Sequence, residues 1–148
     1  MLEKIKSEIL KKYKATDIKW IFFSVFSNNW DLLMSNGVAD TDKTIPELCE
    51  IIYNWLIQKQ ENIQTIAVDI VEDFQKQDDV NKILTLDPQI FGIFIINRET
   101  KKSWLILPGT SWVKDMRSAL TFVKKKFEIE WSVEIYSFKT NRIVIENN

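Results

Sequence analysis

The stretch from Ile90 to Pro108 places the tightest limit on how this chain can fold. Its apolar runs, Ile90–Ile96 and Trp104–Leu107, flank a polar centre at Asn97–Lys102. Two apolar runs separated by a charged turn are typical of a β-hairpin. Because nearly every residue of the two runs is apolar, both faces of these strands need to be covered. The sequence therefore predicts a sheet with helices packed against it.

Three segments show the apolar spacing of an amphipathic helix. They lie at the N-terminus, after Thr44 and after Ser111, and the second opens with the capping-box pattern of Thr44 and Glu47. We expect the following residues to face the core: Leu2, Ile5, Ile9, Leu10 and Tyr13 in the first segment, Leu48, Ile51, Ile52, Trp55 and Leu56 in the second, and Val113, Met116, Leu120, Val123 and Phe127 in the third.

The remaining apolar segments are expected to be strands. Ile18–Phe26 and Trp30–Met34 form a first hairpin, which leads into a loop at Ser35–Asp40, where Gly37 can adopt a positive φ. Trp131–Phe138 and Arg142–Ile145 form a last hairpin or an edge strand pair. In the order of the chain, the expected elements are α-β-β-α-β-β-β-α-β-β.

The segment Thr65–Phe74 alternates regularly between apolar and polar residues. The alternation places Ile66, Val68, Ile70 and Phe74 on one side, and Asp69 and Asp73 on a side that faces water or a polar groove. Because hairpins dominate the order of elements, we expect a mainly antiparallel sheet of about seven strands with three helices. The fold class is α+β, and residues 1–148 are expected to form a single domain.

Composition excludes several functional classes. The chain has no histidine, which rules out histidine-based triads and histidine–metal sites, and its single cysteine cannot form an internal disulfide. A net charge of −1 argues against nucleic-acid binding. No apolar run approaches the roughly 20 residues that a membrane-spanning helix needs. We therefore expect a cytoplasmic protein without a membrane association.

The candidate catalytic groups are each better explained by structure. Cys49 lies within the apolar stripe of the second helix, so we expect a packed thiol rather than a nucleophile. Asp40 and Asp42 could bind a divalent cation, but turn formation before a helix explains them better. Asp69 and Asp73 share a strand face, and a solvated face is the better reading than a catalytic pair. No metal site and no cofactor are predicted.

The turn at Gly109, Thr110, Ser111 and Trp112 is the better candidate for binding. Small residues before a helix can expose N–H groups to a small anion, although a plain helix cap is the better explanation of them. Trp112 beside this turn, and Trp30 at the first hairpin turn, are expected to be exposed contacts for a partner.

The run Ile66–Ile93, followed by Leu105–Pro108 and by Tyr136–Phe138, resembles the AMME-syndrome candidate protein family. The resemblance spans about residues 20–145 and implies an α+β fold with a partner role. The family motif R-G-C-I-G-T falls on Leu33–Val38, where only Gly37 matches. By order of elements alone, the chain is also similar to roadblock and profilin-like domains, which are dimerising interaction modules.

We therefore expect a non-catalytic binding or scaffold protein with a protein partner. The candidate binding residues are Ser35, Asn36, Gly37, Asp40, Gly109, Thr110, Ser111 and Trp112. One alternative is a dimerising module that self-associates as a homodimer through a sheet edge or a helix. The other is an enzyme that uses carboxylates or a metal on a small anionic metabolite, near Asp40, Asp42, Asp69 and Asp73.

Overall fold

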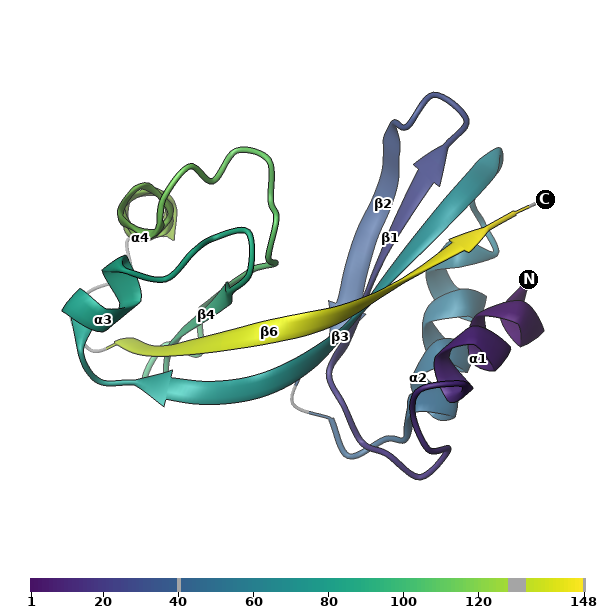
Figure 1. The fold of residues 1–148 in the computed structure, drawn as a ribbon, viewed down its shortest axis with the longest axis horizontal. Coiled ribbons are helices and arrows are strands. Elements are labelled where there is room, and N and C mark those ends of the chain that lie inside the picture. The colour runs from purple at the N-terminus through teal and green to yellow at the C-terminus, as the bar shows by residue number, and fades with distance from the viewer. Residues whose placement is uncertain (40, 128–132, 148) are drawn as a thin grey trace. The chain divides into compact units, whose positions relative to one another are not determined.

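A computed structural model describes residues 1–39, 41–127 and 133–147. The described helices are α1 (Leu2–Leu10), α2 (Ile45–Ile52), α3 (Val80–Leu84) and α4 (Met116–Phe127), and a π-helical turn, η1 (Tyr53–Ile57), directly follows α2 (Figure 1). The strands are β1 (Ile21–Ser27), β2 (Leu32–Val38), β3 (Ile63–Gln77), β4 (Gly92–Asn97), β5 (Ser103–Ile106) and β6 (Val133–Glu146). The predicted α+β class is confirmed. Among the described residues, no helix is long and apolar enough to cross a membrane.

The six described strands form one sheet in the order β2-β1-β3-β6-β4-β5. Its pattern is the same from either edge: a hairpin, then two long strands, then a hairpin. Strand β1 pairs antiparallel with β2 and with β3, and β4 pairs antiparallel with β5 and with β6. The sheet has six strands rather than about seven because the predicted last hairpin is one continuous strand, β6. Residues 131 and 132 of that prediction lie outside the described residues.

The residues pack as two compact units. Unit 1 comprises Met1–Val71 and Asn141–Asn148, and unit 2 comprises Glu72–Thr140. The elements α1, β1, β2, α2 and β3 are followed by α3, β4, β5, α4 and β6, so the order helix, hairpin, helix, long strand occurs twice. Each long strand begins in one unit and ends in the other.

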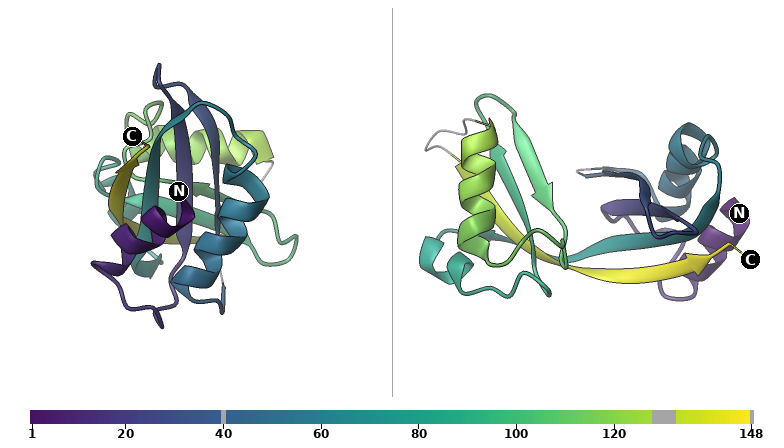
Figure 2. Two further views of the ribbon diagram at one scale, coloured as in Figure 1. Left: turned by 90° about the vertical axis from the view of Figure 1, so that its right-hand side faces the viewer. Right: turned by 90° about the horizontal axis from the view of Figure 1, so that it is seen from above.

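The core of unit 1 lies between its strands and the helices α1 and α2, which contact each other (Figure 2). The described core residues are Ile5 and Ile9 of α1, Ile45, Leu48, Cys49 and Ile52 of α2, Ile57 of η1, Ile21, Phe23 and Val25 of β1, Ile66, Val68 and Ile70 of β3, and Ile143 and Ile145 of β6. Thr44 precedes α2, and its carbonyl accepts the Leu48 N–H at 3.0 Å. Its hydroxyl does not cap the helix and donates to the Glu47 carboxylate at 3.1 Å.

The core of unit 2 lies between α4 and the strands β4, β5 and β6. Val113, Met116, Leu120 and Val123 are buried in it as the helical spacing predicts, and the side chain of Phe127 lies outside the described part of the chain. The short helix α3 was not predicted, since its segment is mostly polar. Asp79 caps this helix by accepting a hydrogen bond from the Asn81 N–H at 2.9 Å, and Ile83 anchors it in the core.

The prediction that Trp55 is buried is wrong. Its side chain is 71% exposed, whereas Ile57 is fully buried. The reason is the π-helical turn η1, in which the Gln58 N–H donates to the Tyr53 carbonyl at 2.8 Å. This wider turn carries the buried face from Ile52 to Ile57, so the spacing of 3.6 residues no longer applies at Trp55.

The predicted faces of β3 also change along the strand. Ile66, Val68 and Ile70 enter the core of unit 1 as expected, but Phe74 instead stacks on Tyr136 in unit 2, with ring centroids 4.7 Å apart. Asp73, which lies between Ile70 and Phe74 in the strand, has a φ of 51°, and this conformation interrupts the regular alternation of side chains. A periodicity argument cannot detect this irregularity, because a positive φ leaves no trace in the spacing of apolar residues, even at an aspartate, which adopts it more readily than most residues do.

Gly37 is required by packing rather than by a positive φ. Gly109 has a φ of 73°, whereas Gly37 lies in the regular part of β2 and pairs with Phe22. A Cβ atom at Gly37 would overlap the Phe22 ring and the Ile21 carbonyl oxygen. The glycine therefore lets an aromatic ring lie across the neighbouring strand.

Replacing Gly37 with alanine should lower the free energy of unfolding by about 1–3 kcal/mol, since the ring and the backbone of β1 have to move. Urea denaturation measures this change. Leu32→Ala is the matched control on the same strand, because Leu32 is 56% exposed, and it should cost no more than about 0.5 kcal/mol. Equal effects of the two substitutions would contradict the packing argument.

Candidate binding surfaces

The first group of predicted binding residues lies in a strand and not in a loop. Ser35, Asn36 and Gly37 belong to β2, and Ser35 pairs with Ser24, with their hydroxyl oxygens 3.3 Å apart. Asp40, the fourth residue of this group, lies outside the described residues. Sequence reasoning ended the strand too early because Ser-Asn-Gly is typical turn chemistry. What β2 offers to a partner is therefore a strand edge.

Strand β2 forms one edge of the sheet. Its sequence from Leu32 to Val38, LLMSNGV, contains no charged residue and no proline. Charges and prolines are the usual devices that prevent edge strands from pairing with another chain. Strand β2 lacks both, although the Asn36 side chain accepts a hydrogen bond from the Gly37 N–H at 2.7 Å.

The second predicted group, Gly109–Trp112, follows β5 in a turn of unit 2. The Gly109 N–H donates to the Pro88 carbonyl at 2.9 Å, and the Thr110 hydroxyl donates to the Leu107 carbonyl at 2.6 Å. This turn does not form the N-terminus of α4, which begins at Met116. Asp115 instead accepts the Ser118 N–H at 2.7 Å, and this backbone hydrogen bond lowers the pKa of the Asp115 carboxyl.

Trp112 is the member of this group that reaches an exposed surface. Its side chain is 46% exposed and contacts Phe122 of α4, with ring centroids 4.8 Å apart and ring planes at 52°. The Phe122 ring is 42% exposed. The Lys126 ammonium lies 5.4 Å from the centre of the Phe122 ring and 5.5 Å from that of Trp104. We call Trp112, Phe122 and Lys126 the α4 surface.

The charge of α4 is entirely positive. Its sequence from Met116 to Phe127 contains Arg117 and Lys124–Lys126 but neither aspartate nor glutamate. Arg117 and the three lysines are exposed. The lysines in the last turn suit the helix dipole, and they also give the surroundings of Phe122 a positive charge. The sequence predicts the exposure of Trp112, but it does not predict the contact of Trp112 with Phe122 beside these cations.

The carboxylates expected to face water do not form an open acidic site. Asp69 is 0% exposed, so the predicted wet face is wrong at this residue. The Arg142 guanidinium donates two hydrogen bonds to the Asp69 carboxylate, both at 2.9 Å, and this pairing raises the pKa of Arg142. The described residues contain no group of three or more Asp, Glu or Cys side chains placed to hold a metal ion.

A second ionic group, in unit 2, links the turn after β4 to strand β6. The Tyr136 hydroxyl donates to the Glu134 carboxylate at 2.7 Å, and the Arg98 guanidinium donates to the same carboxylate at 2.9 Å. These hydrogen bonds, that of Tyr136 first, lower the pKa of Glu134. No local pattern marks this contact, because Arg98 and Glu134 lie 36 residues apart in the chain.

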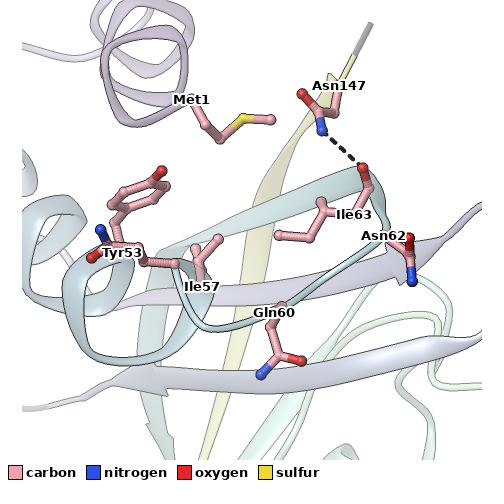
Figure 3. A pocket seen from close by; sticks show the side chains of 8 residues that line it. Met1, Tyr53, Ile57, Gln60, Asn62, Ile63 and Asn147 are labelled. Carbon is pink, nitrogen blue, oxygen red and sulfur yellow. Dashed lines mark hydrogen bonds between the residues drawn. The ribbon is translucent and has the colours of Figure 1, made fainter.

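Unit 1 also contains a cavity of about 210 Å³, which no sequence motif marks. Its lining residues are Met1, Tyr53, Ile57, Gln58, Gln60, Asn62, Ile63 and Asn147 (Figure 3). Tyr53 and Ile57 come from η1, while Met1 precedes α1 and Asn147 follows β6. The chain segments that build this cavity are therefore distant in sequence.

The chain is similar in structure to an uncharacterised protein, PH0010, from Pyrococcus horikoshii. The two share 13% of their residues, with a TM-score of 0.71 over 88% of this chain and 75% of that protein. This similarity concerns the fold alone. No protein-family model and no curated protein matches the chain.

Cys49 is buried in the core of unit 1, as the sequence predicts. Burial raises the pKa of its thiol to about 12. Because the thiolate is the reactive form, the folded protein holds this cysteine in its unreactive state at neutral pH.

Cys49 should therefore react slowly with Ellman's reagent at about pH 8 in the folded protein, and rapidly after unfolding, where its pKa returns to about 8.5. The raised pKa also means that stability is fully present below the unfolded pKa and is lost as the pH rises from there towards about 12. Absorbance of the released thiolate measures the reaction. Rapid labelling without denaturant would refute the buried thiol.

Proposed function

We propose that the chain is a non-catalytic binding or scaffold protein that contacts its partner through the α4 surface. The observation that carries the proposal is the contact between Trp112 and Phe122, both more than two-fifths exposed. Aromatic side chains are enriched among the few residues that dominate protein interfaces. The resemblance to the AMME-syndrome candidate family implies the same kind of role, and it stays a prediction.

The chemistry of the partner follows from the charge around the aromatic pair. Lys126 lies over the Phe122 ring, and Lys125 is exposed in the same turn of α4. A partner segment with acidic side chains beside an apolar or aromatic anchor complements both features. The anchor packs against Trp112 and Phe122, and the carboxylates pair with the lysines at the rim. We therefore propose an acidic protein segment as the partner.

Peptides selected from a random phage-displayed library against this protein should be acidic and contain an aromatic or aliphatic residue. The Trp112→Ala/Phe122→Ala variant should bind them about thirtyfold more weakly, a loss of about 2 kcal/mol, because it removes the anchor site. Isothermal titration calorimetry measures these affinities. Lys125→Glu/Lys126→Glu should weaken binding as well, and the effect should diminish at high salt.

Trp55→Ala is the matched control, since Trp55 is an even more exposed tryptophan that lies in unit 1. It should leave the affinity unchanged. The proposal fails if the Trp55 variant and the α4 variants lose affinity equally, or if the selected peptides carry no excess of acidic residues.

Self-association through β2 is a second candidate, favoured by the absence of charge and proline on this edge strand. Two β2 strands related by a twofold axis would pair antiparallel and extend the sheet across both copies. This arrangement is the sheet-edge form of the dimerising-module alternative. It needs no residue of the α4 surface, so one molecule could use both.

If β2 mediates a dimer, sedimentation velocity should show dimer formation that increases with protein concentration. Asn36→Lys should return the protein to a monomer, because it places a charge on the exposed edge. Asn29→Lys, which adds the same charge in the neighbouring turn, should leave the dimer intact. A monomer at all concentrations would exclude this candidate.

A further inference from the structure

The cavity of unit 1 belongs to neither the α4 surface nor the edge strand β2. None of the eight side chains that line it is charged. Gln58, Gln60, Asn62 and Asn147 carry amide groups, Tyr53 carries a phenol, and the others are apolar. Figure 3 shows the Met1, Ile57 and Ile63 side chains around the hollow, together with the Tyr53 ring. The lining therefore combines apolar contact with neutral groups that form hydrogen bonds.

The backbone around the cavity has two uncommon conformations. The π-helical turn η1 supplies Tyr53 and Ile57. Such turns are rare in proteins, and those that occur are often found at functional sites. Asn62 at the wall has a φ of 61°, a left-handed conformation that costs free energy in a residue other than glycine. Both features lie within ten residues of each other and line the same cavity.

Hydrogen bonds fix the wall on the side of β3. The Asn147 side-chain amide donates to the Ile63 carbonyl at 2.9 Å, and the Asn147 N–H donates to the Gln64 carbonyl at 2.7 Å (Figure 3). These bonds hold the residue after β6 against the start of β3. The orientation of the Asn147 amide is thereby set before any ligand arrives, which lowers the entropic cost of binding.

We propose that this cavity binds a small uncharged molecule that carries amide or hydroxyl groups. Side-chain amides and a phenol both donate and accept hydrogen bonds, so they match groups of the same kind. A cation would lose hydration without gaining an opposite charge, since none of the side chains that line the cavity carries one. The volume equals that of about seven water molecules, so a small molecule can enter the cavity whole.

Two-dimensional ¹H–¹⁵N NMR spectra of the whole chain test this inference with defined probes. N-methylacetamide supplies the amide group and glycerol the hydroxyl groups, while methylammonium and tetramethylammonium are the charged controls. We expect saturable shifts of the amide signals of residues 53–63 and 147 with at least one neutral probe, and none with the charged controls. The neutral probe that binds more tightly identifies the kind of group that the cavity prefers.

Two variants connect the signal to the cavity. Tyr53→Phe should weaken binding about fivefold, since it removes one hydrogen bond and leaves the ring in place. Ile63→Phe should abolish binding by filling the space, and the dispersion of its spectrum shows whether it is folded. Val144→Thr, at an exposed position of β6, should change nothing. Shifts that do not saturate, that spread over the whole surface, that appear equally with the charged controls, or that persist unchanged in Tyr53→Phe would overturn the proposal.

Discussion

The long strands β3 and β6 constrain the rest of the structure, because each contributes side chains to both units. Ile135 of β6 enters the core of unit 2, whereas Ile143 and Ile145 of the same strand enter the core of unit 1. Successive side chains of a strand point to opposite faces, so a shift of one residue would remove them all from their cores. In unit 1 the buried Asp69 carboxylate and Arg142 also tie the two strands together, through two hydrogen bonds of 2.9 Å. The net gain in stability from such a pair is small, since removing the Asp69 carboxylate from water has a large cost.

The regular parts of the fold could be predicted from the sequence, and the irregular parts could not. The hairpin of β4 and β5 and the buried stripe of α4 follow directly from apolar periodicity. The π-helical turn after α2 and the positive φ at Asp73 each displace a periodic pattern, and they moved Trp55 and Phe74 to places that the spacing does not predict. The burial of Asp69 could not be predicted for another reason: its partner Arg142 lies 73 residues away in the sequence. Periodicity shows which residues of a strand lie on the same face. It does not show whether a residue from a distant strand covers that face.

The candidate sites show the same division. Trp112 could be found because a tryptophan beside a glycine turn has no place in a helical stripe, and it is exposed. Its contact with Phe122 could not be predicted, because the contact depends on the orientation of the turn relative to α4, and no local sequence pattern specifies that orientation. The cavity could not be found at all, since its lining comes from three separate parts of the chain and has no charged side chain. Such residues attract no attention in a sequence, and only folding brings them together.

The exchange of strand ends between the two units has a consequence for the order in which the chain can fold. Unit 1 contains the first 71 residues, yet its core includes Ile143 and Ile145, which are made only after the whole of unit 2. During synthesis, the hairpin of β1 and β2 can form early, but one side of β3 lacks its neighbour until β6 has left the ribosome. The unpaired edge of β3 is the kind of surface on which incomplete chains aggregate. Ile143 and Ile145, which follow unit 2 in the chain, thus complete a core whose other members precede unit 2.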